Sequence, residues 1–140
     1  MHTISIKSTK KTECIDVTDH VQQIVNKEHL RNGFVIVFVP HTTAAVTINE
    51  GADPAVQFDI LKTLNDLIPI HKGYTHAEGN SAAHIKASIL GSSELILVKN
   101  EKLELGTWQH LFFFEGDGPR DRLIYVQVCP IPEETCCKEE

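Results

Sequence analysis

Apolar and polar residues alternate with period two in several short stretches of this chain, and each such stretch predicts a β-strand. One run, Phe34–Val39, is apolar throughout, which is typical of a central strand buried on both faces. Pro40 ends this run, so His41 follows the strand that we expect to be most buried. The stretches expected to form strands are residues 3–7, 14–17, 34–39, 44–49, 94–98, 102–105, 108–114 and 123–128.

Three other stretches repeat apolar residues at helical spacing and predict α-helices. The first should begin at Thr18, its expected N-cap, and end at Asn32–Gly33. The second begins at Asp53–Pro54, a capping carboxylate followed by proline at the first helical position, and ends before Pro69. The third is capped by Asn80–Ser81. The side chains expected to face the core from the second and third helices are Phe58, Leu61, Leu64, Leu67 or Ile68, and Ala82, Ile85 and Ile89.

Strands and helices along the chain together predict an α+β fold in one domain, residues 1–132. A length of 140 residues with 41% hydrophobic and 23% charged residues suits an ordinary globular domain with a real core. Residues 133–140 read as an acidic, flexible C-terminal tail. The segment Cys129–Glu140 carries four Glu and one Lys, so about half of the chain's net charge of −6 lies there.

Composition also excludes several classes of function. No basic patch or aromatic ladder suggests a nucleic-acid partner. No apolar run is long enough to span a bilayer, and Met1–Thr3 does not open a signal peptide, so we expect a cytoplasmic protein with no membrane partner. Four cysteines are too few for a secreted disulfide framework, and Cys136–Cys137 reads as a reduced pair in the tail rather than a metal site.

Three histidines near turns of small residues carry the candidate chemistry: His41, His76 and His84. Two or three imidazoles plus a carboxylate, here Glu78, can bind a borderline divalent metal and leave a position open for catalysis. If Ser81 begins a helix, the backbone N–H groups of its first turn can bind an anion beside the metal. The alternative is that His84 is a hydrogen-bonded histidine in a packed turn.

Two further clusters extend the candidate site. Trp108 follows a glycine turn and forms either the wall of a ligand site or an anchor of the core, whereas Gln109 is expected to contact a ligand. Arg120 follows a Gly-Pro pair and can clamp a phosphate with two parallel hydrogen bonds, which a plain turn does not need. Asp53 is explained as a helix cap, but Glu50 is not, so Glu50 joins the candidates.

These residues belong to four ordered motifs that resemble the YjbQ family over nearly the whole chain. The motifs are residues 41–54, from His-Thr-Thr-Ala to Asn-Glu-Gly-Ala-Asp-Pro, residues 78–86, residues 106–109, Gly-Thr-Trp-Gln, and residues 117–120, Asp-Gly-Pro-Arg. That family is described as a secondary thiamine-phosphate synthase. The resemblance implies a compact α+β fold with mixed or antiparallel sheets in a sandwich-like core and about three helices. It also implies a homotrimer with a metal pocket built from histidines.

Carried onto this chain, the resemblance gives each candidate a role. The metal ligands are His41, His76 and His84, and the expected cofactor is a divalent ion, zinc first, although these ligands also admit manganese, nickel and iron. The expected catalytic residues are Glu50, Glu78, Glu115 and Gln109. The expected substrate- or phosphate-binding residues are Asn80, Ser81, Lys86, Trp108 and Arg120.

Three functions are consistent with this set. The first is a metal-dependent transferase with thiamine-phosphate synthase activity, as a main or a side reaction, which joins a hydroxymethylpyrimidine diphosphate to a thiazole phosphate. The second is a metal-assisted hydrolase of a small phosphorylated metabolite, with Glu50, Glu78 or Glu115 as the base. The third is a non-catalytic trimer that binds such a metabolite. We expect a small phosphorylated metabolite as the partner in each case.

Overall fold

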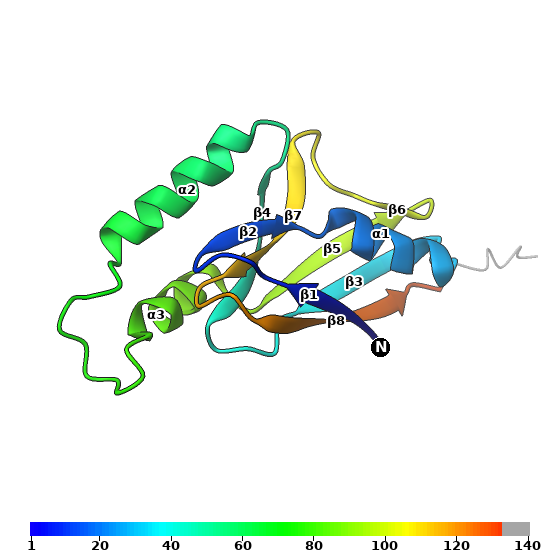
Figure 1. Ribbon diagram of the computed structural model, residues 1–140. Coiled ribbons are helices and arrows are strands. Elements are labelled where there is room, and N and C mark those ends of the chain that lie inside the picture. Colours follow the sequence, from blue (N-terminus) through cyan, green and yellow to red (C-terminus); the bar gives the residue numbers. More distant parts are fainter. Residues whose placement is uncertain (133–140) are drawn as a thin grey trace, which may run out of the picture.

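The computed structural model describes residues 1–132, which form two antiparallel β-sheets and three helices (Figure 1). The predicted tail, residues 133–140, and with it Cys136 and Cys137, lies outside the described residues. The elements are β1 (His2–Lys7), β2 (Glu13–Asp16), α1 (Thr18–Lys27), β3 (Asn32–Phe38), β4 (Ala44–Glu50), α2 (Pro54–Leu67), α3 (Ser81–Leu90), β5 (Ser93–Lys99), β6 (Lys102–Leu103), β7 (Gln109–Glu115) and β8 (Asp121–Pro130).

The strands divide into a five-stranded sheet A, in the order β1-β8-β3-β5-β6, and a three-stranded sheet B, in the order β2-β7-β4. Every strand pair is antiparallel. The predicted α+β fold, one domain of antiparallel sheets with three helices, is therefore confirmed. None of the helices within residues 1–132 combines the length and the apolar character needed to cross a membrane.

The core lies between the inner faces of the two sheets and α1. Val21 and Val25 of α1, Val37 of β3 and Phe113 of β7 are each 0% exposed and belong to one apolar cluster. Along β3 the buried valines alternate with more exposed residues, as the period of two in an extended chain requires, whereas β7 is buried on both faces. Burial of these apolar side chains is the main stabilising contribution to the fold.

The outer faces of the two sheets differ. The outer face of sheet B is covered by helices, because Ala45 and Phe114 pack with Leu61 and Leu64 of α2 and with Ala87 of α3. The outer face of sheet A is exposed, although it is largely apolar. Its exposed apolar side chains are Ile36, Phe38, Leu95, Leu97 and Leu123.

This exposed face corrects the prediction for residues 34–39. We expected a strand buried on both faces, but only Val35, Val37 and Val39 are buried, whereas Ile36 is 37% and Phe38 42% exposed. A continuous apolar run shows only that both faces of the strand carry apolar side chains. It does not show whether another element of the fold packs on each face.

The first helix also differs from its prediction. The helix ends at Lys27 with Glu28 as its C-cap, and Gly33 lies inside β3 rather than at the helix end. Its N-cap is Val17, which makes no side-chain cap hydrogen bond. Thr18, the predicted N-cap, is instead the first helical residue, and its hydroxyl donates to Asp16 at 2.6 Å. The positive φ of 49° at His29 turns the chain away from the helix four residues before Gly33.

The start of α2 is as predicted, because the carboxylate of Asp53 accepts a hydrogen bond from the N–H of Ala55 at 2.9 Å. The predicted inward stripe of α2 is partly wrong. Phe58 is 66% and Leu67 68% exposed. Leu61 and Leu64, the middle of the stripe, alone reach the cluster on sheet B.

The inward face of α3 was also predicted partly wrongly. Ile85 and Ile89 are exposed, whereas Ala83, Lys86 and Ala87 are buried beside Ala82. Alanine side chains let a helix backbone approach a sheet closely, and here they define the packed face in place of the larger isoleucines. α3 packs on β4 in this way and thereby brings its N-terminus to the end of that strand nearest His41.

Candidate functional site

A pocket of about 470 Å³ lies where β3 ends, β8 begins and α3 starts. It is lined by Pro40, His41, Thr42, Thr43, His76, Glu78, Asn80, His84, Arg120 and Arg122. We call it the histidine pocket. The structure thus brings together the three histidines singled out in the sequence, together with Glu78, Asn80 and Arg120.

The histidines are held in different ways. The Nε2 atom of His41 accepts a hydrogen bond from the backbone N–H of Leu123 at 2.9 Å, because the end of β3 adjoins β8. Burial and the neighbouring Arg122 guanidinium lower the pKa of His41, so its ring is neutral at pH 7. His76 and His84 face each other edge to face, with ring centroids 5.4 Å apart.

In this arrangement the three histidines are not grouped as metal ligands. Within residues 1–132, no three His, Cys, Asp or Glu side chains are grouped so that they could hold a metal ion. One nitrogen of His41 is already engaged by the Leu123 amide, which leaves only the Nδ1 atom for any other partner. A divalent ion bound by these residues stays a prediction.

Arg122, which lines the pocket, forms a buried ion pair with Glu115. Arg122 donates from Nε to Oε2 of Glu115 at 2.8 Å and from Nη2 to Oε1 at 2.6 Å, and Nη2 also donates to Thr43 Oγ1 at 2.8 Å. The Glu115 carboxylate accepts further hydrogen bonds from Ser8 Oγ at 2.8 Å and from the Asp117 amide at 2.9 Å. Burial alone would raise the pKa of Glu115, but these hydrogen bonds outweigh burial and lower it.

Glu115 is therefore ionised and fully satisfied, with a side chain that is 0% exposed. A carboxylate that accepts this many hydrogen bonds is a poor general base. Its position indicates that it orients Arg122 rather than contacts a ligand, whereas the sequence predicted a catalytic role.

A second network positions Arg120. Its Nη2 donates to Asp117 Oδ2 at 2.9 Å and its Nε to the Asp117 carbonyl at 2.8 Å. Asp117 also accepts from Lys11 and, at 3.0 Å, from Asn80 Nδ2. Burial would raise the pKa of Asp117, but hydrogen bonds from Lys11, Asn80 and Arg120 outweigh burial and lower it to about 2. Arg120 is thereby held in place while its side chain remains 50% exposed at the pocket.

The N-terminus of α3 contributes backbone donors. The carbonyl of Asn80 accepts from the N–H groups of Ala83 and His84, but the Asn80 side chain does not cap the helix. The first N–H groups of any helix, here those of Ser81 and Ala82, have no acceptor inside the helix. The N-cap residue Asn80 and His84 line the histidine pocket, so the positive end of the helix dipole lies at the pocket. Ser81, a predicted phosphate-binding residue, lines an adjoining hollow with His76 and His84 instead of the histidine pocket, and Ala82 is buried.

The other predicted site residues lie at the opposite end of sheet B. Glu50 pairs with Gln109 across β4 and β7, whereas Ala44 pairs with Glu115 at the pocket end of the same ladder. Six residues of extended chain separate the two ends by roughly 20 Å. Glu50 and Gln109 therefore do not share a site with the histidine pocket within one chain.

Trp108 and Lys86 also lie away from the pocket. Trp108 is 62% exposed, so the alternative that it anchors the core is wrong. Lys86 is 1% exposed, and its Nζ donates to Asn65 Oδ1 at 2.6 Å beneath α2. Burial and then the nearby Lys11 lower the pKa of Lys86. Lys86 does not line the histidine pocket.

Arg122 and Lys11 were not among the residues predicted from the sequence. Arg122 could have been found, because it occupies an inward position of β8 in phase with the buried Ile124 and Val126. A charged residue at such a position needs a buried partner of opposite charge. Which acidic residue supplies it is set by the pairing of distant strands, which no local pattern shows.

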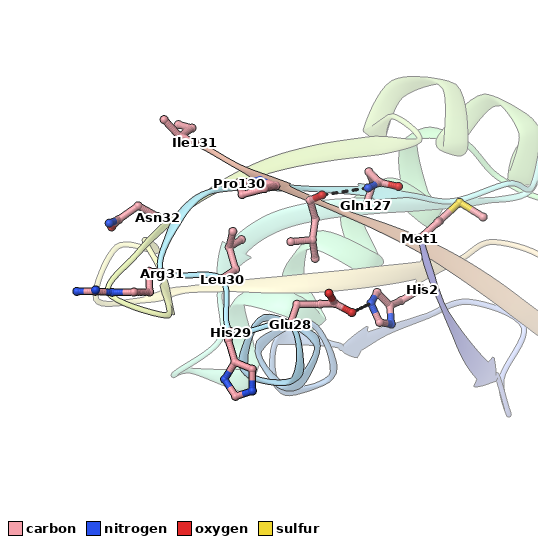
Figure 2. A pocket seen from close by; sticks show the side chains of 11 residues that line it. Met1, His2, Glu28, His29, Leu30, Arg31, Asn32, Gln127, Pro130 and Ile131 are labelled. Atoms are coloured by element: carbon pink, nitrogen blue, oxygen red, sulfur yellow. Dashed lines mark hydrogen bonds and ion pairs between the residues drawn. The ribbon is translucent and has the colours of Figure 1, made fainter. Parts of the chain in front are cut away.

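A second hollow, of about 320 Å³, lies at the other end of sheet A, where β3 begins and β8 ends. Figure 2 shows His2 and Glu28 turned toward each other there, and their side chains are 2.6 Å apart. Gln127 Nε2 donates to the Val128 carbonyl at 3.0 Å. Because these polar groups already have partners, this hollow is the weaker candidate for a functional site.

Comparison with known proteins gives a consistent family. A family profile described as "UPF0047 protein YjbQ-like" matches residues 2–130. A UPF0047 protein of Methanocaldococcus jannaschii is 47% identical over 123 residues, which cover 88% of this chain and 89% of that protein.

Solved structures agree with this comparison. An uncharacterized conserved protein of the YjbQ/UPF0047 family from Clostridium acetobutylicum has a TM-score of 0.91 and 47% identity, over 92% of this chain and 100% of that one. A YbjQ-like protein of unknown function from Sulfolobus solfataricus has a TM-score of 0.86 and 36% identity, over 89% and 92% of the two chains.

These findings correct the predicted function. The relatives carry only the name of an uncharacterised family, and the structural neighbours are described as uncharacterized or of unknown function. None of these names supports a thiamine-phosphate synthase, and the described residues hold no three-ligand metal group. The prediction of a metal-dependent thiamine-phosphate synthase is therefore wrong, and the metal-assisted hydrolase has no support either.

Proposed function

We propose, for a chain that belongs to the UPF0047 family of YjbQ-like proteins, that the histidine pocket binds the phosphate group of a small metabolite. One observation carries the proposal: a half-exposed guanidinium, Arg120, and the uncapped N-terminus of α3 line the same pocket. Arginine offers paired donors that match phosphate oxygens, and a helix N-terminus offers backbone N–H groups and a favourable dipole.

The charged groups around the pocket are largely paired with one another. Asp117 faces two cations, Lys11 and Arg120, and can neutralise only one of them. The second guanidinium, Arg122, is balanced by Glu115 and adds donors rather than net charge. With Glu78, which also lines the pocket, these three cations and three carboxylates sum to zero. Anion binding here therefore depends on the position of the exposed Arg120 donors and the helix end, not on net charge.

Replacing Arg120 by glutamine is expected to weaken phosphate binding about tenfold, because a charge-assisted hydrogen bond contributes roughly 1.5 kcal/mol or more. Titration of inorganic phosphate at pH 7 and low ionic strength, followed by calorimetry, measures this change. The matched control is Arg31→Gln, an arginine at the second hollow, which should leave binding unchanged. The proposal fails if the wild-type protein does not bind phosphate or if Arg120→Gln binds it as well as the wild type does.

The homotrimer implied by the family resemblance stays a prediction, and we place its contacts on the outer face of sheet A. Leu95 and Leu97 are 54% and 58% exposed there, and a large exposed apolar face usually marks an interaction surface. The centre of this face is uncharged, so copies of a chain with net charge −6 can approach there without like-charge repulsion.

Introducing two lysines, Leu95→Lys with Leu97→Lys, is expected to convert the protein from an oligomer to a monomer in light scattering. The control pair, Phe58→Lys with Leu67→Lys, changes two apolar residues of α2 that are slightly more exposed than Leu95 and Leu97, and it should keep the assembly. A monomeric wild type, or a double variant of sheet A that still assembles, would contradict this placement.

A further inference from the structure

We infer that the ligand of the histidine pocket is a short phosphomonoester that also carries a hydrogen-bond donor, a hydroxyl or an ammonium group, on the carbon chain next to its phosphate. This inference rests on the proposed function of the same pocket and adds a second recognition element to it. Two acceptors belong to residues that line the pocket: Asn80 Oδ1, which is buried without a donor, and the exposed carboxylate of Glu78, which opposes a bare phosphate.

The orientation of the Asn80 amide is fixed. Its Nδ2 donates to Asp117 Oδ2 at 3.0 Å, so the other end of the amide must be the Oδ1 atom, an acceptor. Asn80 is only 9% exposed, and within residues 1–132 no group donates to this buried oxygen. A buried acceptor without a donor is unfavourable, and a ligand that supplies one removes that cost.

Glu78 gives the second acceptor. It lines the pocket on the loop that precedes α3, in a turn closed by a hydrogen bond from the Gly79 amide to the His76 carbonyl at 3.1 Å. A bare phosphate at the start of α3 would be repelled by this carboxylate. A ligand that presents an ammonium or hydroxyl group toward Glu78 converts the repulsion into an attraction.

The spacing along the chain limits the size of the ligand. Asn80 directly precedes Ser81, whose N–H group is among the proposed phosphate donors, and Glu78 lies two residues before Asn80. Phosphate donors and acceptors therefore come from one short segment. A ligand that reaches both has its donor group on the carbon chain next to the phosphate rather than at the far end of a large molecule.

Three probes of nearly the same shape test the inference: ethyl phosphate, 2-hydroxyethyl phosphate and O-phosphoethanolamine. They share the phosphate and two carbons and differ in the terminal group, which is a hydrogen, a hydroxyl or an ammonium. At pH 7 we expect at least one of the two donor-bearing probes to bind about fivefold more tightly than ethyl phosphate, the effect of one added hydrogen bond.

Two variants assign the effect to the named residues. Glu78→Gln, at an exposed position, should remove the added affinity of O-phosphoethanolamine while ethyl phosphate still binds. Asn80→Ala should remove the added affinity of 2-hydroxyethyl phosphate. The control Glu104→Gln, an exposed carboxylate outside the pocket, should change none of the three affinities.

The outcomes separate this inference from the proposed function. If none of the three probes binds, both the proposed function and this inference fail. If all three bind equally well, phosphate binding stands and only the requirement for a donor is overturned. The inference is also overturned if a donor-bearing probe keeps its advantage in both Glu78→Gln and Asn80→Ala.

Discussion

Replacing Arg122 by methionine is expected to lower the free energy of unfolding at pH 7 by about 3–5 kcal/mol, the usual effect of removing one partner of a buried ion pair. Arg122 is 6% and Glu115 0% exposed, so the variant leaves a carboxylate in the interior without a counter-ion. Urea unfolding at a single protein concentration measures the change, because any self-association makes stability depend on concentration.

The control is the double variant Glu115→Gln with Arg122→Met. It removes both charges and keeps a carbonyl oxygen to accept the hydrogen bond from the Asp117 amide. We expect it to recover at least half of the stability that Arg122→Met loses, because the cost arises from an unpaired charge rather than from lost contacts. A single variant that loses less than about 1 kcal/mol would contradict the role given to this pair.

The pH dependence of the same variant has a defined sign. In the wild type, folding lowers the pKa of Glu115. The ionised Glu115 side chain therefore stabilises the folded protein above the unfolded pKa of about 4.3, and this stabilisation is lost as the pH falls through the lower, folded pKa. Without Arg122, burial dominates and raises that pKa, so protonation relieves the penalty at acidic pH. The difference in stability between the two proteins should therefore shrink between pH 7 and pH 4.

Elements fixed by local chemistry were predictable from the sequence. Asp53 and Pro54 start α2 because a capping carboxylate and a proline at the first helical position act within a few residues. The strand positions were also predictable, because alternation depends on the chain alone. The choice of buried face was not: Ile85 and Ile89 are exposed because α3 packs through alanines against β4.

For the candidate site too, the residue types were predictable from the sequence, whereas their grouping in space was not. The residue types of the histidine pocket, His41, His76, His84 and Arg120, were recognisable because their chemistry is unusual in turns. Which of the candidates meet depends on strand pairing. The pairing of Glu50 with Gln109 puts both residues at the end of β4 and β7 away from the pocket, a separation that no spacing in the sequence reveals.

Replacing Phe113 by alanine is expected to lower the free energy of unfolding by about 3–5 kcal/mol, since Phe113 is 0% exposed where sheet B packs on the inner face of sheet A. Its neighbours across sheet B are Ile15 and Val46, and backbone pairing on both sides limits how far the strands can move to fill the cavity.

The matched control is Phe58→Ala, which removes the same side chain from the exposed face of α2, where Phe58 is 66% exposed. It should change the stability by less than about 1 kcal/mol, because little apolar area returns to water and alanine favours the helix. Thermal and urea unfolding of both variants measure the contrast. Equal losses of stability from the two substitutions would contradict the role of the apolar cluster between the sheets as the main stabilising contribution. The positions of His41 and Arg122 would then depend on other contacts.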